Sequence, residues 1–216
     1  MPQIFHPSFN TISRVALVGL ILLVIALGWG WTLFTRSDYA ERVHFPREQP
    51  VQFSHQHHVQ RIGIDCRYCH TTVETSSFAN IPPVHTCMTC HSQIWADSPM
   101  LEPVRRSYAT KQPIHWKRVY DLPDFVYFDH SIHVNKGIGC TSCHGQIDRM
   151  PLTWVNQQLH MKWCLDCHLH PELQIRPQSE VFSMVWEAPT NQNELGMALV
   201  NEYQVKSRTD CSYCHR

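Results

Sequence analysis

The chain has 216 residues, with 18 Lys and Arg balanced by 18 Asp and Glu, so its formal net charge is zero with His neutral. This balance offers no basic patch of the kind that nucleic acids bind. The length suits one or two domains, and 43% of the residues are apolar, but outside one amino-terminal segment the chain lacks the long apolar runs of a conventional core.

Residues 15–34 form a stretch of twenty residues without a charge. As a helix this stretch rises about 30 Å and would cross the hydrocarbon layer once. A secretion signal is the alternative, but the stretch is longer than a usual signal core, Trp29 and Trp31 suit a membrane interface, and no small-residue cleavage site follows before Arg36. We therefore expect residues 1–35 to be a retained membrane anchor, followed by a linker over residues 36–50.

Beyond the linker, one short motif occurs five times. It consists of two cysteines three positions apart followed at once by histidine, and the five copies are Cys66-Cys69-His70, Cys87-Cys90-His91, Cys140-Cys143-His144, Cys164-Cys167-His168 and Cys211-Cys214-His215. Two thiols at this spacing form thioethers to the vinyl groups of a porphyrin, and the histidine supplies an imidazole to the iron. The sequence thus predicts five covalently attached c-type haems.

The cysteine count supports this interpretation over two others. All ten cysteines fall in the five motifs, so none remains for a disulfide. Zinc ribbons also use paired cysteines, but they do not need a histidine after every second one. Because the porphyrins themselves supply large apolar faces, we predict a haem-packed multihaem domain with short helices, long irregular loops and little sheet.

An internal repeat divides the haem region. Phe53-Ser-His55-Gln-His-His58-Val precedes the first motif, and Phe128-Asp-His130-Ser-Ile-His133-Val precedes the third with one residue fewer in between. Each of these motifs is followed by another at a similar distance. We predict a first dihaem module at 51–96, a proline-rich strap at 97–127, a second dihaem module at 128–170, and a connector with the fifth motif at 171–216.

The repeated His-x-x-His pairs are candidates for the second axial ligands. Two imidazoles three residues apart share one helical face, so adjacent turns could serve neighbouring haems. We predict that His55, His58, His130 and His133 bind iron, and that His57, which lies between the first two, points away. The fifth iron would take His115, Met150 or Met161, with His44, His85, His160, His170 or an open site as further alternatives.

Attachment of c-type haem in bacteria takes place outside the cytoplasm. We therefore expect a cytoplasmic amino terminus and a haem domain on the periplasmic side of the cytoplasmic membrane. The basic residues of the strap, of which Arg105 and Lys111 are examples, would lie on a solvated face, neutralise propionates or dock an acidic partner.

The motif Phe-x-His-x-x-His-Val before a haem motif resembles the cytochrome c7 and class III multihaem group. The wider pattern includes an anchor, two modules, the segment WKRVYDLPDFVYFDHSIHV at residues 116–134, and M-x-W-C-x-x-C-H at residues 161–168. It resembles the pentahaem subunit of bacterial alternative complex III over nearly the whole chain. One departure is Tyr120, where the family pattern has His.

That resemblance implies a non-catalytic electron-transfer subunit in a respiratory complex that oxidises quinol. Electrons would leave to a periplasmic cytochrome c, a copper protein or an oxidase, and the partners would be polytopic quinol-binding subunits, an iron–sulfur subunit and a monohaem cytochrome. The alternative is a self-sufficient quinol dehydrogenase of the anchored multihaem type that feeds a periplasmic reductase, with Asp38, Glu41 or His44 accepting the quinol protons. A haem enzyme with one open iron is a third possibility.

Overall fold

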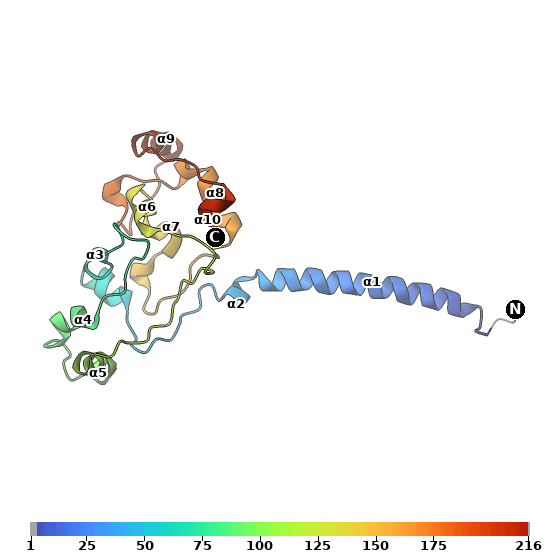
Figure 1. Ribbon diagram of the computed structural model, residues 1–216, viewed down its shortest axis with the longest axis horizontal. Coiled ribbons are helices and arrows are strands. Elements are labelled where there is room, and N and C mark those ends of the chain that lie inside the picture. Colours follow the sequence, from blue (N-terminus) through green and yellow to red (C-terminus); the bar gives the residue numbers. More distant parts are fainter. Residues whose placement is uncertain (1–3, 216) are drawn as a thin grey trace. The chain divides into compact units, whose positions relative to one another are not determined.

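A computed structural model describes residues 4–215 and divides the chain into two compact units, Met1–Val43 and His44–Arg216 (Figure 1). Within the described residues the α-helices are α1 (Ser8–Thr35), α2 (Asp38–Glu41), α3 (Cys66–Cys69), α4 (Val84–His91), α5 (Glu102–Thr110), α6 (His130–Asn135), α7 (Cys140–His144), α8 (Met161–Leu169), α9 (Gln192–Glu202) and α10 (Cys211–Cys214). A π-helical turn, η1 (Gln56–Arg61), and four 3₁₀ turns, η2 (Pro99–Leu101), η3 (Ile147–Arg149), η4 (Pro171–Leu173) and η5 (Gln178–Glu180), complete the set.

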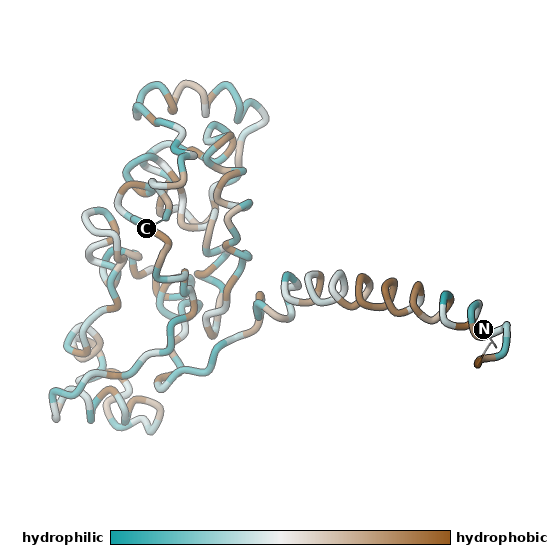
Figure 2. The backbone as a smooth tube through the Cα atoms, turned by 45° about the vertical axis from the view of Figure 1, so that its right-hand side comes forward, coloured by the Kyte–Doolittle hydropathy of each residue, from teal (hydrophilic) through white to brown (hydrophobic). Residues whose placement is uncertain are grey.

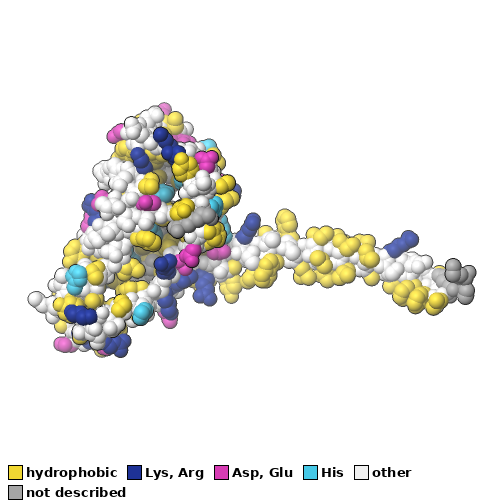
Figure 3. Space-filling model, viewed as in Figure 1, with side chains coloured by type: hydrophobic (Ala, Val, Ile, Leu, Met, Phe, Trp, Pro, Cys, Tyr) yellow, Lys and Arg dark blue, Asp and Glu magenta, His cyan; other side chains and the backbone are white. Residues whose placement is uncertain are grey.

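Helix α1 dominates the first unit. Its 28 residues include an 18-residue window with a mean hydropathy of 2.3, and none of its side chains is buried within the chain. Figure 2 shows apolar colouring through the middle turns of α1 and only short apolar patches elsewhere, and Figure 3 shows apolar side chains along much of the visible side of this helix. Helix α1 is therefore long and apolar enough to span a membrane once, although a signal sequence would meet the same criteria.

The second unit has a very small protein core. Its central cluster consists of Val73, Val134 and Val181, with Ala79 and Phe182 packed against it. Met150, Ile175 and Val181 are the largest fully buried side chains among the described residues. A unit of this length would ordinarily bury far more apolar surface, so the prediction that porphyrins supply much of the core fits this packing.

The predicted fold class is confirmed. The described part of the second unit contains short helices joined by long irregular segments, and its only strand-like pairings are two isolated bridges, Val126 with His215 and Ile138 with Ile175. Helix α9 lies within the connector predicted at residues 171–216. Two predicted irregular segments contain helices: α5 lies within residues 97–127, and α2 lies within residues 36–50.

Candidate haem-binding sites

Each haem motif lies on a short helix. The two cysteines of every motif occupy positions i and i+3 of α3, α4, α7, α8 or α10, so their thiols share one helical face. Local chemistry starts the first of these helices, because the Asp65 carboxylate accepts a hydrogen bond from the Arg67 backbone N–H at 2.8 Å. All ten cysteines are free thiols, as attachment through thioethers requires.

The arrangement does not suit zinc. A structural zinc site gathers four Cys or His side chains around one ion. Within residues 4–215 no group of three or more Cys, His, Asp or Glu side chains converges on a common point. The motifs are instead spread over five separate helices.

The predicted second axial ligands lie on the helices that the repeat predicts. His130 and His133 belong to α6, whereas His55 caps η1 and His58 lies inside it. In each copy, one phenylalanine contacts both imidazoles in the same way. Phe128 lies edge-on to His130 at 4.8 Å and stacks on His133 at 4.7 Å.

Phe53 repeats this geometry in the first copy, with ring-centre distances of 5.0 Å to His55 and 4.4 Å to His58. The interplanar angles are 87° and 22°, against 88° and 25° in the second copy. The phenylalanine that opens the repeated motif therefore orients both imidazoles, a role that the sequence analysis did not assign.

The single-residue difference between the two copies has a structural explanation. His58 and Gly63 are five residues apart, whereas the equivalent His133 and Gly137 are four apart. Both glycines have φ near +80° and end their turns in the left-handed region. The extra residue lies within η1, where the wider π-helical turn absorbs it, while second-copy α6 is an ordinary α-helix. The distance from each glycine to its first motif cysteine stays the same.

Three of the predicted ligands face the histidine of a motif at the separation expected for two ligands of one iron. Two imidazole nitrogens, each about 2.0–2.1 Å from a shared metal, place the ring centres about 6.3 Å apart. The observed ring-centre distances are 6.1 Å for His58 and His91, 6.4 Å for His130 and His144, and 6.1 Å for His133 and His168. These residues therefore fit a haem iron held between two imidazoles.

His55 lies close enough to the motif residue His70 for the two imidazoles to interact electrostatically. Burial lowers the pKa of His55 to about 4, and among the titratable groups His70 contributes most to this lowering, followed by His58. The same causes hold the other buried imidazoles neutral: burial lowers the pKa of His144 to about 4 and also lowers the pKa of His133 and His58. A neutral imidazole is the form that binds a metal.

Hydrogen bonds to Nδ1 leave Nε2 of these imidazoles available. Nδ1 of His58 lies 2.9 Å from the Ser54 carbonyl, and Nδ1 of His133 lies 2.7 Å from the Asp129 carbonyl, each four residues earlier in the chain. Nδ1 of the motif residue His70 likewise lies 2.7 Å from the Asn80 carbonyl. A carbonyl at Nδ1 fixes the tautomer and the plane of the ring, as it does for histidines that bind metals.

Two further hydrogen bonds to Nδ1 connect the two predicted modules. Nδ1 of His130 in the second module lies 2.8 Å from the Ser77 carbonyl of the first. Nδ1 of His55 in the first module lies 3.1 Å from the Thr153 hydroxyl of the second. Each module thus orients one predicted ligand of the other, and neither Ser77 nor Thr153 was a candidate from sequence.

Contacts between motifs order them in space as second, first, third, fourth, fifth. Tyr68 Oη of the first motif lies 3.1 Å from Thr89 Oγ1 of the second. The remaining steps follow from motif cysteines that lie close enough to interact electrostatically: Cys66 with Cys140, Cys143 with both cysteines of the fourth motif, and Cys164 with Cys214. Burial raises the pKa of the Cys143 thiol to about 12.

The fifth motif pairs with the carboxyl-terminal end of the strap through a bridge between Val126 and His215, with the Tyr127 N–H donating to the Cys214 carbonyl at 2.8 Å. The ring beside His215 is that of Phe125, at a centre-to-centre distance of 5.8 Å. Of the three predicted fifth ligands, His115 and Met161 are exposed and Met150 is fully buried.

Tyr120, at the position where the family pattern has His, lies beside a different motif. Its ring contacts that of His144 edge-on at 4.5 Å, and its hydroxyl donates to the Cys143 carbonyl at 3.3 Å while accepting from the Asn156 N–H at 2.9 Å. It therefore packs against the third motif from the strap.

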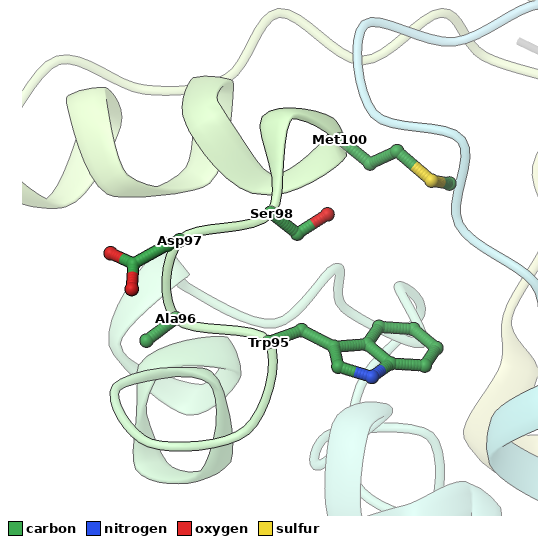
Figure 4. Close-up of a pocket in the computed structure, with 5 residues that line it drawn as sticks. All are labelled: Trp95, Ala96, Asp97, Ser98 and Met100. Carbon is green, nitrogen blue, oxygen red and sulfur yellow. The ribbon is translucent and has the colours of Figure 1, made fainter.

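An open pocket of about 480 Å³ adjoins the second motif (Figure 4). Trp95 and Met100 point into the same side of this pocket, whereas Asp97 points away. The Trp95 ring stacks on His57 at 5.3 Å and on the motif residue His91 at 6.4 Å. The pocket therefore lies where it could receive an apolar porphyrin edge. His57 packs on Trp95 and does not face a motif histidine.

Comparison with known proteins agrees with this geometry. Residues 126–216 match the family of cytochrome c7 and related cytochrome c. The carboxyl-terminal part is a cytochrome c7-type multihaem domain. The chain is also 28% identical over 208 residues to a protein of Nitratidesulfovibrio vulgaris named "Menaquinone reductase, multiheme cytochrome c subunit", with 90% of this chain and 87% of the relative covered. Haem of the c type is thus the cofactor of this c7-type domain.

Proposed function

We propose that this chain is the membrane-anchored pentahaem subunit of a quinone-linked oxidoreductase complex, with one haem on each of its five motifs. When bound, each haem iron takes up and releases one electron. The observation that carries the proposal is the ring spacing of 6.1–6.4 Å between three predicted ligands and three motif histidines. An iron held between two imidazoles changes oxidation state with little rearrangement and has no position for a substrate, which favours a relay over a catalytic haem.

The proposed ligand pairs are His58 with His91, His130 with His144, His133 with His168, and His55 with His70. For the fifth iron the proposal keeps His115, Met150 or Met161 as the ligand from this chain. The proposed modules are those predicted from sequence, at 51–96 and 128–170, with the fifth motif added after them.

The complex would contain polytopic quinone-binding subunits, an iron–sulfur subunit and a monohaem cytochrome, with the haem domain on the periplasmic side. The resemblance to alternative complex III favours quinol oxidation, with delivery to a periplasmic cytochrome c, a copper protein or an oxidase. The relative is named for menaquinone reduction, so the opposite direction is a second candidate for the same relay.

Purification from native membranes in mild detergent tests this function. We expect five added tetrapyrrole masses on the denatured chain, a wholly low-spin spectrum, and co-purifying iron–sulfur and polytopic subunits. Reduction of the haems by a quinol analogue in the complex, but not in the isolated chain, would distinguish the relay from a self-sufficient quinol dehydrogenase. A denatured chain without added tetrapyrrole mass would refute the proposal.

Turnover assays on the purified complex decide the direction. Steady quinol oxidation with a periplasmic acceptor supports the first direction. Quinone reduction by a reduced periplasmic carrier supports the direction for which the relative is named.

A further inference from the structure

A buried cation lies beside the third haem motif. Only 5% of the surface of Arg176 is exposed, and its backbone N–H donates to the Gly137 carbonyl at 2.9 Å. The guanidinium lies over Gly139, the residue directly before Cys140, and a Cβ at position 139 would overlap it. Arg176 Nη2 donates to the Thr141 hydroxyl, between the two motif cysteines, at 2.8 Å.

This guanidinium makes no direct ion pair among the described residues, although the Glu180 carboxylate interacts with it electrostatically and the Trp186 ring centre lies 5.8 Å from it. Its other hydrogen bonds go to the backbone carbonyls of Glu180 and Ser183, both at 3.4 Å, and its Nε is buried without an acceptor. No ion pair of the described residues includes it. Burial lowers its pKa from the ordinary value, but a guanidinium remains protonated at neutral pH.

Burial of this charge lowers the stability of the fold. A buried ion without a direct ion pair is destabilising, because it has lost its hydration. The position therefore calls for an explanation that depends on charge.

A propionate of the same haem does not supply the missing partner. The propionates lie on the edge of a c-type haem opposite the vinyl groups, and the vinyl groups are the ones that Cys140 and Cys143 hold. Arg176 contacts the residues around Cys140, which places it near the attached edge. Its charge consequently lies next to the porphyrin without a propionate of the same haem as counter-ion.

We propose that Arg176 raises the midpoint potential of the haem carried by the third motif. This inference rests on the proposed attachment of a haem to Cys140 and Cys143. Reduction removes one positive charge from the iron, so a cation held in a low-dielectric environment favours the reduced form. The third motif is the middle one in the spatial order, so Arg176 strengthens the binding of an electron at the centre of the relay.

Potentiometric titration of the full-length chain, followed by visible absorption, tests this role. Replacing Arg176 with Gln, and separately with Met, should move one of the five reduction steps to lower potential and leave four in place. Arg176→Lys keeps the charge and should keep the step close to its wild-type position.

Arg208→Gln is the matched control. Arg208 also lies close to a haem motif, three residues before Cys211, and it stacks over Tyr213 at 4.4 Å, but it is exposed and screened by solvent. We expect no shifted step in this variant. A shift as large as that of Arg176→Gln would show that loss of any nearby arginine has this effect, and would overturn the inference.

The affected haem is identified by a second substitution. His130→Ala should make the haem of the third motif high-spin, and the potential of that high-spin signal should fall when Arg176→Gln is added. Five attached haems with unshifted steps in both Arg176→Gln and Arg176→Met would refute the inference, and so would an equal shift in Arg176→Lys. Loss of the haems from the wild-type chain would instead refute the proposed function.

Discussion

At the scale of single residues, the neighbouring histidines His57 and His58 have different surroundings. His58 faces His91 at 6.1 Å, whereas His57 stacks on Trp95. Replacing His58 with Ala should convert one haem to high spin while all five remain covalently attached, because thioether formation does not depend on the second ligand. Electron paramagnetic resonance with mass spectrometry measures both outcomes.

His57→Ala is the control for this substitution, since it removes an imidazole one position away that faces no motif histidine. It should leave the low-spin signals intact. A high-spin signal in His57→Ala together with none in His58→Ala would reverse the proposed assignment.

Thr153 offers a finer test at the same scale. Its hydroxyl accepts from His55 Nδ1 when Nε2 binds iron, and such a bond makes the imidazole a stronger donor to the oxidised metal. Thr153→Val removes the acceptor at nearly constant volume. We expect one midpoint potential to rise and the spectrum to remain low-spin; an unchanged set of five potentials would show that this hydrogen bond has no electronic effect.

At the scale of elements, the π-helical turn η1 predicts which deletions the first module tolerates. Removing exposed Gln60 makes the first copy equal in length to the second, so the turn should close as an α-helix and keep the His55 to His58 spacing. We expect five low-spin haems and unchanged thermal stability, measured by spin state and by circular dichroism.

Deleting Ile64 is the matched contrast, because this residue lies between Gly63 and Cys66, where both copies have the same length. The shift of Cys66 relative to His55 should leave the first haem without its second ligand. Equal spin states in the two deletion variants would contradict the role given to η1.

The sequence predicts some of these elements better than others. The helices at the five motifs and at the His-x-x-His pairs follow from short-range spacing, whereas the extra residue between the first pair and its motif did not by itself predict the π-helical turn η1. The supports from Ser77 and Thr153 span 53 and 98 positions, so no local pattern indicates them. Helix α5 was missed because Pro99, Pro103 and Pro113 indicate an irregular strap, whereas Pro103 lies in the first turn of α5, where proline is compatible with a helix.

At the scale of the whole molecule, the chain divides between Val43 and His44, so the second unit should fold and bind haem without the first. A chain of residues 44–216, exported behind a cleavable signal, should carry five haems and be recovered in the soluble periplasmic fraction. The full-length chain should stay with the membrane, since α1 has the length and hydropathy of a span. Cell fractionation with haem staining measures both; a truncated chain still bound to membranes would mean that α1 is not what retains the protein.

The hydrogen bonds that connect the two predicted modules at His55 and His130 have a consequence for biosynthesis. A polypeptide made from its amino end presents His55 long before Thr153 has been synthesised, so the earliest site stays loosely ordered until the last third of the chain arrives. The imidazole of His55 would then take its final orientation only after the second dihaem segment has been made.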